Sequence, residues 1–138
     1  MRYSYNSFRT HYKIIYQFAF LFFVSCRVQV KFLDLTLPQY WLPQYHWVFS
    51  TEVLEHIEAN FEPVVLDNID RAASYGAVLS WAPPGQKGLH HVNNRPAEYV
   101  NKVMRKRGFL FDLPTSQKLR AAAKFSWLRK NLMVFYRQ

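Results

Sequence analysis

The sequence predicts an α/β domain with a mostly parallel sheet and helices on both of its faces. Two apolar runs of strand length, Trp47 to Phe49 and Ala77 to Trp81, are separated by a stretch that begins at Pro63 and carries an apolar stripe. Apolar residues at that spacing are typical of an amphipathic helix. Strands that alternate with such helices build parallel sheets with helices packed on the faces.

The remaining elements follow along the chain. Residues 27–34 alternate polar and apolar side chains, as a half-buried strand does. Gly76 falls where the helix at 63–73 should end. Beyond the strand at 77–81, the pattern predicts a helix at 96–107, a strand at 109–113, a basic helix at 116–130 and a last strand at 132–136.

Length and composition indicate one folded domain. The chain has 138 residues, of which 50% are hydrophobic and 18% aromatic, and this composition excludes a disordered chain. Cys26 is the one cysteine in the sequence. An internal disulfide framework and a cysteine-rich zinc site are therefore excluded.

The net charge of +9 arises in the last part of the chain. Residues 1–100 contain eight Lys and Arg and eight Asp and Glu, whereas residues 101–138 contain ten Lys and Arg and only Asp112 as an acid. This asymmetry indicates an anionic partner, or else solvated helix faces.

Residues 1–27 do not resemble the rest of the chain, and we expect the domain to occupy residues 28–138. Three basic residues precede an apolar run from Ile14 to Val24, which is too short to span a bilayer. A charged start, an apolar centre and a small-residue exit before Arg27 are typical of a secretory signal at residues 1–26. The alternatives are a buried strand or helix, or an upstream segment foreign to the domain.

The candidate chemistry is concentrated where the first apolar run ends, at Ser50 and Thr51. Either hydroxyl can cap a helix that begins there. Glu52, Glu55 and His56 follow at i, i+3 and i+4, so on a helix they share one face. Two carboxylates and an imidazole at a strand end hold a metal or serve as acid and base. The alternative is that the glutamates only favour a helix start, whose dipole attracts negative charge.

The same stretch, Trp47 to Ile57 (WVFSTEVLEHI), resembles the fourth-strand motif of the class I S-adenosylmethionine-dependent methyltransferases. The likeness continues through the strand and exit at 77–85, the strand start at 108–109 and the closing strand at 132–136, and so covers residues 28–138. It implies a partial Rossmann-like methyltransferase sheet. It also implies methyl transfer from S-adenosylmethionine to a hydroxyl of a small molecule or an RNA, in a cytoplasmic enzyme.

The resemblance further implies which residues meet the cofactor. Asp34 ends the strand at 27–34, where the family often contacts the adenine, although an Asx turn would explain this residue equally well. Ser50 and Thr51, at the end of the fourth strand, complete the expected set. The glycine-rich turn of the family is absent, because all four glycines follow the central motif, and no acidic residue precedes Asp34. We therefore expect a truncated or degenerate methyltransferase.

A metal site is implied by two branches of the family, the ubiquinone-pathway O-methyltransferases and the small-RNA 2′-O-methyltransferases. Both share the arrangement of Glu52, Glu55 and His56, and in the latter a histidine after the fifth strand completes the site. His91, or its neighbour His90, occupies that place. These ligands suit Mg²⁺, Mn²⁺ or Zn²⁺, with Glu52 and His56 as catalytic residues. In a metal-free site, His56 or His91 would act as a general base.

Two further features leave alternatives open. Asn93, Asn94 and Arg95 form a loop for substrate recognition, or else a turn with an Asn cap before Pro96. The basic C-terminal third would allow a non-catalytic module to bind nucleic acid or another anion, which is the alternative to the methyltransferase hypothesis. The sequence predicts no transmembrane segment.

Overall fold

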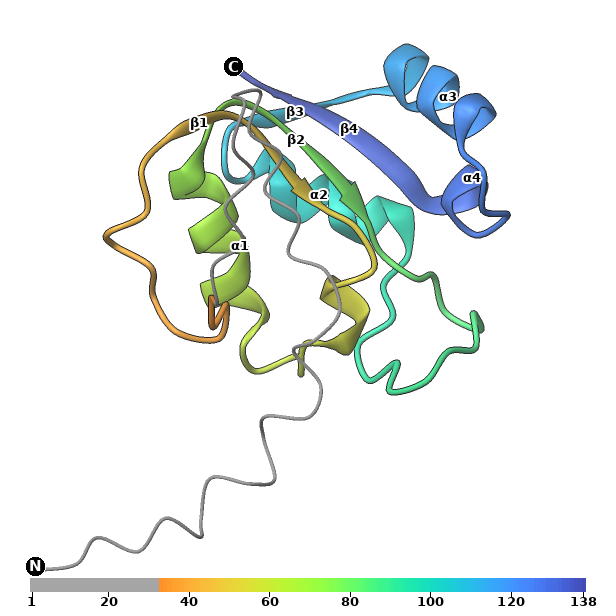
Figure 1. Cartoon of the computed structure of the whole chain (residues 1–138), viewed down its shortest axis with the longest axis horizontal. Helices are drawn as coiled ribbons and strands as arrows, with labels where there is room; N and C mark the ends of the chain where they lie inside the picture. The colour runs from red at the N-terminus through yellow and green to blue at the C-terminus, as the bar shows by residue number, and fades with distance from the viewer. Residues whose placement is uncertain (1–32) are drawn as a thin grey trace, which may run out of the picture.

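The computed structural model describes residues 33–138 (Figure 1). Within these residues no helix has both the length and the apolar character needed to cross a membrane. The elements in chain order are β1 (Tyr45–Ser50), the 3₁₀ helix η1 (Leu54–His56), α1 (Glu62–Ala72), β2 (Ala73–Ser80), α2 (Ala97–Arg105), β3 (Phe109–Asp112), α3 (Leu113–Ala122), α4 (Leu128–Asn131) and β4 (Leu132–Arg137).

The predictions for the start of the chain lie largely outside the described residues. These are the separate segment at 1–27, the secretory signal at 1–26 and most of the strand at 27–34. Leu33 and Asp34, which would end that strand, are described and belong to no strand.

The four strands form one sheet in the order β1-β2-β4-β3. β1 pairs with β2 in parallel, and β4 pairs antiparallel with β2 and with β3. Two of the three pairings are therefore antiparallel, and the expectation of a mostly parallel sheet is wrong. β1, β2 and β3 share one direction, and β4 runs against them from a position between β2 and β3.

The direction of β4 follows from the connection that precedes it. α3 and α4 leave the sheet after Asp112, the last residue of β3, and return to it at Leu132. Asp112 pairs with Val134, near the start of β4, so the chain re-enters the sheet at the same end of the strands at which it left. An antiparallel neighbour of this kind needs no crossover of the sheet.

Helices cover both faces of the sheet, as predicted. Successive side chains of a strand point to opposite faces, and β2 and β4 accordingly contribute to two core clusters. The larger cluster joins Ala77, Leu79, Met133 and Phe135 to Val65, Leu66, Ile69 and Ala72 of α1 and to Val100 and Met104 of α2. The smaller cluster joins Val78, Leu132 and Val134 to Leu119 of α3 and Leu128 of α4.

Gly76 lies inside β2 and does not end α1, so that prediction is wrong. A Cβ atom at Gly76 would lie 2.5 Å from Cζ3 of Trp47 and 2.7 Å from the carbonyl oxygen of Phe135. The missing side chain therefore leaves room for the ring of Trp47 in β1 and for the backbone of Phe135 in β4 to approach β2. α1 ends at Ala72 and β2 begins at the next residue.

The predicted basic helix at 116–130 is two shorter helices, α3 and α4. α3 begins earlier than predicted because Asp112 caps it, accepting a hydrogen bond from the N–H of Thr115 at 3.0 Å. Pro114 occupies the first turn, where its missing N–H costs nothing. The chain turns after Ala122 before it enters α4.

Candidate active site

The candidate site lies at the carboxyl ends of β1 and β2, where two connections meet (Figure 1). One connection leads through η1 to α1, and the other is the loop at 81–96 that leads to α2. The N–H groups of Val92 and Asn93 donate to the carbonyl oxygen of Glu55, at 2.9 and 3.0 Å. These bonds fix the loop against η1. In α/β sheets this edge is where ligands bind.

Glu52 turns the chain immediately after β1 and has a left-handed backbone, with φ of 58°. Among the described residues, Glu52 and His90 are the two non-glycines with positive φ, and both belong to this site. Such a conformation costs about 1 kcal/mol or more, and it is concentrated at functional sites. Two hydrogen bonds to Ser80 offset the cost at Glu52.

The helix predicted to begin at this point is a single 3₁₀ turn, η1. Neither Ser50 nor Thr51 caps it, because the N-cap residue is Val53, which makes no side-chain bond. Glu52 precedes η1, so it does not share a helix face with Glu55 and His56 as the spacing predicts. The hydroxyl of Ser50 is buried without a hydrogen-bond partner among the described residues.

Glu55 is fully buried, and neither oxygen of its carboxylate has a hydrogen-bond partner among residues 33–138. Burial raises its pKa to about 7, because the charged form loses hydration, and the nearby Glu52 carboxylate adds to this effect. The backbone N–H groups of Glu55 and Ala82 lower the pKa in part, without completing a hydrogen bond to either oxygen. The carboxylate therefore lacks a partner that would stabilise its charge.

Two histidines lie beside this carboxylate, with their rings 5.0 Å apart in an edge-to-face arrangement. Nδ1 of His56 lies 3.1 Å from the carbonyl oxygen of His90, and Nδ1 of His91 lies 3.2 Å from that of Gln86. A carbonyl oxygen accepts only, so each Nδ1 carries the proton and Nε2 keeps its lone pair. Burial also lowers the pKa of His56, with a smaller contribution from His91, which favours the neutral imidazole.

Together these three side chains form a group that could hold a metal ion. One ligand atom each from Glu55, His56 and His91 lies within 4.8 Å of the others. Glu52 is not a member of this group. His90 is exposed and contributes its backbone carbonyl to His56. His91 is thus the downstream histidine that the fold brings to Glu55.

Gly88 makes room for the ring of His91. A Cβ atom at Gly88 would lie 2.1 Å from Nε2 of His91, so a side chain here would displace the imidazole. The glycine is therefore a condition for the position of His91.

The asparagines of the polar loop hold its backbone. Asn94 donates from Nδ2 to the carbonyl oxygens of Pro83 and Gln86, at 2.9 and 3.0 Å. Trp81 donates from its indole nitrogen to the carbonyl oxygen of Asn93 at 2.6 Å. These bonds give Asn93 and Asn94 a structural role in holding the loop. The Asn cap is absent, because Pro96 is the N-cap residue of α2 and no side chain caps this helix.

Glu62, which the sequence did not single out, connects this loop to both of the neighbouring helices. It begins α1 and is only 5% exposed. Its carboxylate accepts hydrogen bonds from Asn93 and from Nε of Arg95, each at 3.0 Å, and from the hydroxyl of Tyr99 in α2. Arg95 also stacks on the ring of Tyr99, 4.6 Å from its centroid. An acid at the start of a helix usually indicates only a favourable dipole, so this role needed the tertiary structure.

Asp34 forms the Asx turn that was one of its two interpretations. Its Oδ1 accepts hydrogen bonds from the N–H of Thr36 at 2.9 Å and from the hydroxyl of Thr36 at 2.6 Å. Oδ2 has no hydrogen bond among the described residues, so the turn does not occupy the whole carboxylate. The adenine contact stays a prediction.

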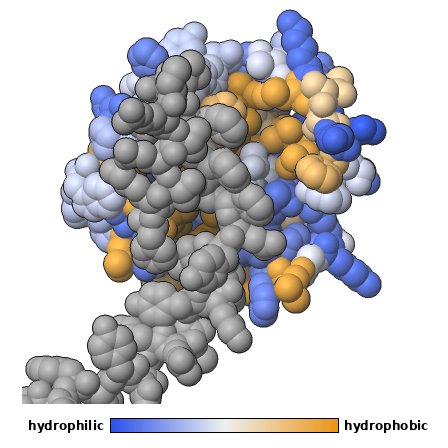
Figure 2. Space-filling view, viewed as in Figure 1, coloured by the Kyte–Doolittle hydropathy of each residue, from blue (hydrophilic) through white to orange (hydrophobic). Residues whose placement is uncertain are grey.

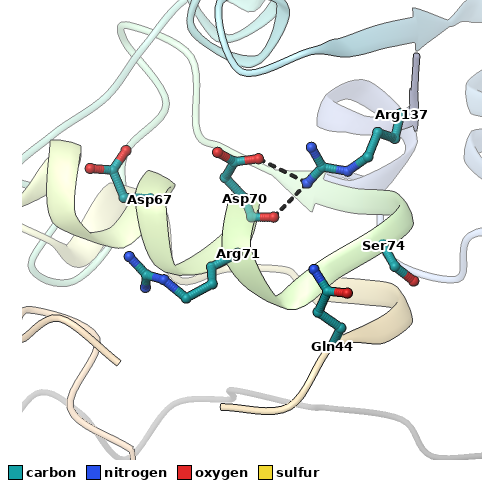
Figure 3. Close-up of a pocket in the computed structure, with 6 residues that line it drawn as sticks. All are labelled: Gln44, Asp67, Asp70, Arg71, Ser74 and Arg137. Atoms are coloured by element: carbon teal, nitrogen blue, oxygen red, sulfur yellow. Dashed lines mark hydrogen bonds and ion pairs between the residues drawn. The ribbon is translucent and has the colours of Figure 1, made fainter. Parts of the chain in front are cut away.

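A separate cavity of about 510 Å³ lies at the end of α1, away from the predicted site residues (Figure 3). Its lining charges are largely paired. Arg137 donates to Asp70 at 2.8 Å and to the carbonyl oxygen of Ala73. Asp67 pairs with Arg107 at 2.8 Å, and Arg71 donates to the neutral side chain of Asn68 at 3.2 Å. We infer that these residues hold the end of α1 against the end of β4.

No family model matches the chain, and no curated protein matches its sequence. In structure, the chain is similar to magnesium protoporphyrin IX methyltransferase from Synechocystis PCC 6803. The crystal structure with bound SAH gives a TM-score of 0.53 at 15% identity, over 77% of this chain and 49% of that one. The structure with bound SAM gives 0.54 at 16% identity, over 77% and 44%. This chain thus has a class I methyltransferase-like fold, as the sequence resemblance implies, and spans less than half the length of these proteins.

Proposed function

We propose that this chain is a methyltransferase domain that transfers a methyl group from S-adenosylmethionine to a hydroxyl oxygen of a small molecule or an RNA. The fold supports the reaction class, and the two similar crystal structures hold SAH and SAM. Because the chain spans less than half of those proteins, the activity of a whole enzyme belongs to the proposal and not to the likeness.

The observation that carries the proposal is the position of Glu55 beside His56 and His91. A buried carboxylate without partners is costly when charged, and a divalent cation removes that cost. The two imidazoles are oriented by carbonyl oxygens, which is how metal-binding histidines are held in proteins. The residues therefore fit a divalent cation, and we propose all three as its ligands.

The donor set is one carboxylate and two imidazoles, which suits Mn²⁺ or Zn²⁺ and is compatible with Mg²⁺. When bound, such an ion supplies Lewis acidity toward a substrate hydroxyl. Glu55, His56 and His91 would hold the ion beyond the ends of β1 and β2. We propose that Glu52, which was expected to be a ligand, instead braces the turn after β1 through Ser80.

For the cofactor we keep the predicted residues Asp34, Ser50 and Thr51. Ser50 supports this role because its hydroxyl is buried at the carboxyl end of β1 without a partner among the described residues. Oδ2 of Asp34 also has no hydrogen-bond partner among the described residues.

Thermal unfolding of the chelator-treated protein, with and without added Mn²⁺, Mg²⁺ or Zn²⁺, tests the metal site. We expect stabilisation by at least one ion, by about 2.7 kcal/mol when the ion is at about a hundred times its dissociation constant. Glu55→Gln and His91→Ala should abolish the effect. Glu58→Gln, which changes an exposed glutamate three residues away, should preserve it. An identical response of all three variants would exclude the proposed ligands.

Calorimetric titration with S-adenosylhomocysteine tests the cofactor separately. Binding that weakens in Asp34→Ala supports the enzyme proposal for this chain. No binding by a protein that still responds to the metal would leave the metal site in place and remove the methyltransferase activity of this chain.

A further inference from the structure

The turn between α3 and α4 exposes two aromatic side chains next to each other. Phe125 and Trp127 are 53% and 42% exposed, and their rings stack with centroids 4.9 Å apart and planes 15° apart. This turn projects at the edge of the molecule, beyond β4 (Figure 1). Single exposed apolar residues are common on protein surfaces and need no explanation. A stacked pair of exposed aromatic rings at a projecting turn, by contrast, indicates a contact surface.

Cationic residues flank this pair in the sequence. Lys124, Arg129 and Lys130 are all exposed, and no acidic residue follows Asp112 in the sequence. The ion pairs found among residues 33–138 involve other cations, namely Arg95, Arg107 and Arg137. The positive charge beside the aromatic pair is therefore not neutralised by the fold. We call residues 124–130 the aromatic-basic turn.

The aromatic-basic turn is held firmly. Its backbone is closed by hydrogen bonds from the N–H of Arg129 to the carbonyl oxygen of Phe125 at 3.2 Å, and from the N–H of Lys130 to that of Trp127 at 3.0 Å. Leu128 packs into the smaller core cluster below. Nε of Arg129 donates to the carbonyl oxygen of Ala123 at 2.8 Å. The backbone that carries the two rings is thus held in place, so binding needs little ordering of the turn.

Figure 2 shows hydrophobic and strongly hydrophilic surface side by side over the end of the molecule that carries α4. Trp and Phe side chains settle at the boundary between lipid headgroups and acyl chains. Lys and Arg beside them are attracted to anionic headgroups. The surface offers both of these interactions at one place.

We propose that the aromatic-basic turn binds the domain to a membrane surface that contains anionic phospholipid. A nucleic acid is less suited to this turn, because Phe125 and Trp127 stack on each other, so each ring already has one face covered and the two do not form separate platforms for successive bases. This proposal does not depend on the methyltransferase function.

Co-sedimentation of the full chain with vesicles tests the proposal. One set of vesicles contains phosphatidylcholine alone, and the other contains about one quarter phosphatidylserine. We expect binding to the anionic vesicles, weakened by salt because charge screening reduces the attraction. Phe125→Ser combined with Trp127→Ser should weaken that binding about tenfold or more. Both residues are exposed, and unchanged thermal unfolding will show that the variant folds.

A matched pair of charge reversals separates the turn from the net charge of the protein. Lys124→Glu with Lys130→Glu should weaken vesicle binding about tenfold or more. Lys102→Glu with Lys106→Glu changes the net charge equally at two exposed residues of α2 and its C-cap, and should have an effect of about twofold or less.

The apolar run Ile14 to Val24 could itself bind vesicles, so the variants decide the result and not the wild-type protein alone. Absence of binding to anionic vesicles would overturn the proposal, as would equal losses in the two charge reversals. Vesicle binding that is unchanged without the two aromatic rings would also overturn it. Binding of single-stranded RNA that depends on these rings, with no binding of vesicles, would assign the turn to nucleic acid instead.

Discussion

Ser80 and Glu52 are joined by two hydrogen bonds that run in opposite directions. Oγ of Ser80 accepts from the backbone N–H of Glu52 at 2.7 Å and donates to Oε1 of Glu52 at 2.8 Å. Ser80 is the last residue of β2 and is fully buried, whereas Glu52 follows β1 with positive φ. The pair therefore locks the ends of two neighbouring strands and fixes the turn from which Glu55 and His56 follow.

Replacement of this serine should destabilise the protein. Ser80→Ala leaves the N–H of Glu52 and one carboxylate oxygen without their partner, and we expect the free energy of unfolding to fall by about 1 to 3 kcal/mol. Urea denaturation measures the change. Ser126→Ala alters an exposed serine and should change the stability by less than about 0.5 kcal/mol. Equal stabilities of the two variants would show that the brace contributes nothing.

Gly88→Ala should damage the candidate metal site while leaving the fold intact. The added Cβ would meet the ring of His91, and this ring is the end of a side chain that can rotate away. We expect thermal stabilisation by Mn²⁺ or Zn²⁺ to be lost, with a change of less than about 1 kcal/mol in the metal-free protein.

Gly85→Ala is the matched control for that variant. Gly85 has φ of 87° and open space around its Cβ position, so alanine would cost about 1 kcal/mol through backbone strain without touching His91. The metal response should survive. A metal response that is lost in Gly85→Ala and retained in Gly88→Ala would contradict our account of the site.

Removal of the Glu62 carboxylate should loosen the contact between α1, the loop at 81–96 and α2. Glu62→Ala leaves Asn93, Arg95 and Tyr99 without their shared acceptor, and we expect a loss of about 3 kcal/mol in urea denaturation. The hydrogen bond to Glu62 is also the main cause of the raised pKa of Tyr99. The tyrosinate of the variant should therefore form at lower pH in an ultraviolet titration. An unchanged titration would mean that the bond is absent in solution.

Asp112 should stabilise α3 in a pH-dependent way. Hydrogen bonds from the N–H and the hydroxyl of Thr115 lower its pKa from the ordinary value of 3.8. A carboxylate with a lowered pKa in the folded state stabilises the protein above its ordinary pKa, and this contribution is lost as the pH falls through the folded-state pKa. The advantage of the wild type over Asp112→Asn should thus be larger at neutral pH than below the ordinary pKa. Unfolding curves across this range measure it, and a constant difference would contradict the role of the charge.

The sequence predicts most of the elements because each has a local physical signal. α1 follows from the apolar stripe after Pro63, and α2 from the stripe that places Val100 and Met104 in the core. β1 and β4 follow from short apolar runs. Local signals fail where an element depends on distant neighbours. Gly76 has the local signal of a helix end, but it lies in β2, where its missing side chain leaves room for the ring of Trp47 and the backbone of Phe135.

By itself, the sequence determined that this is an α/β chain with helices on both faces, and it predicted a candidate site after β1 with Glu52, Glu55 and His56. Only the tertiary structure decided that β4 runs antiparallel, because strand direction depends on where a connection returns to the sheet and not on composition. It also decided that Glu55, and not Glu52, lies with His91. With its left-handed backbone, Glu52 precedes a single 3₁₀ turn and bonds to Ser80, whereas Glu55 within that turn lies with the two histidines, which sequence spacing on an assumed α-helix cannot reveal.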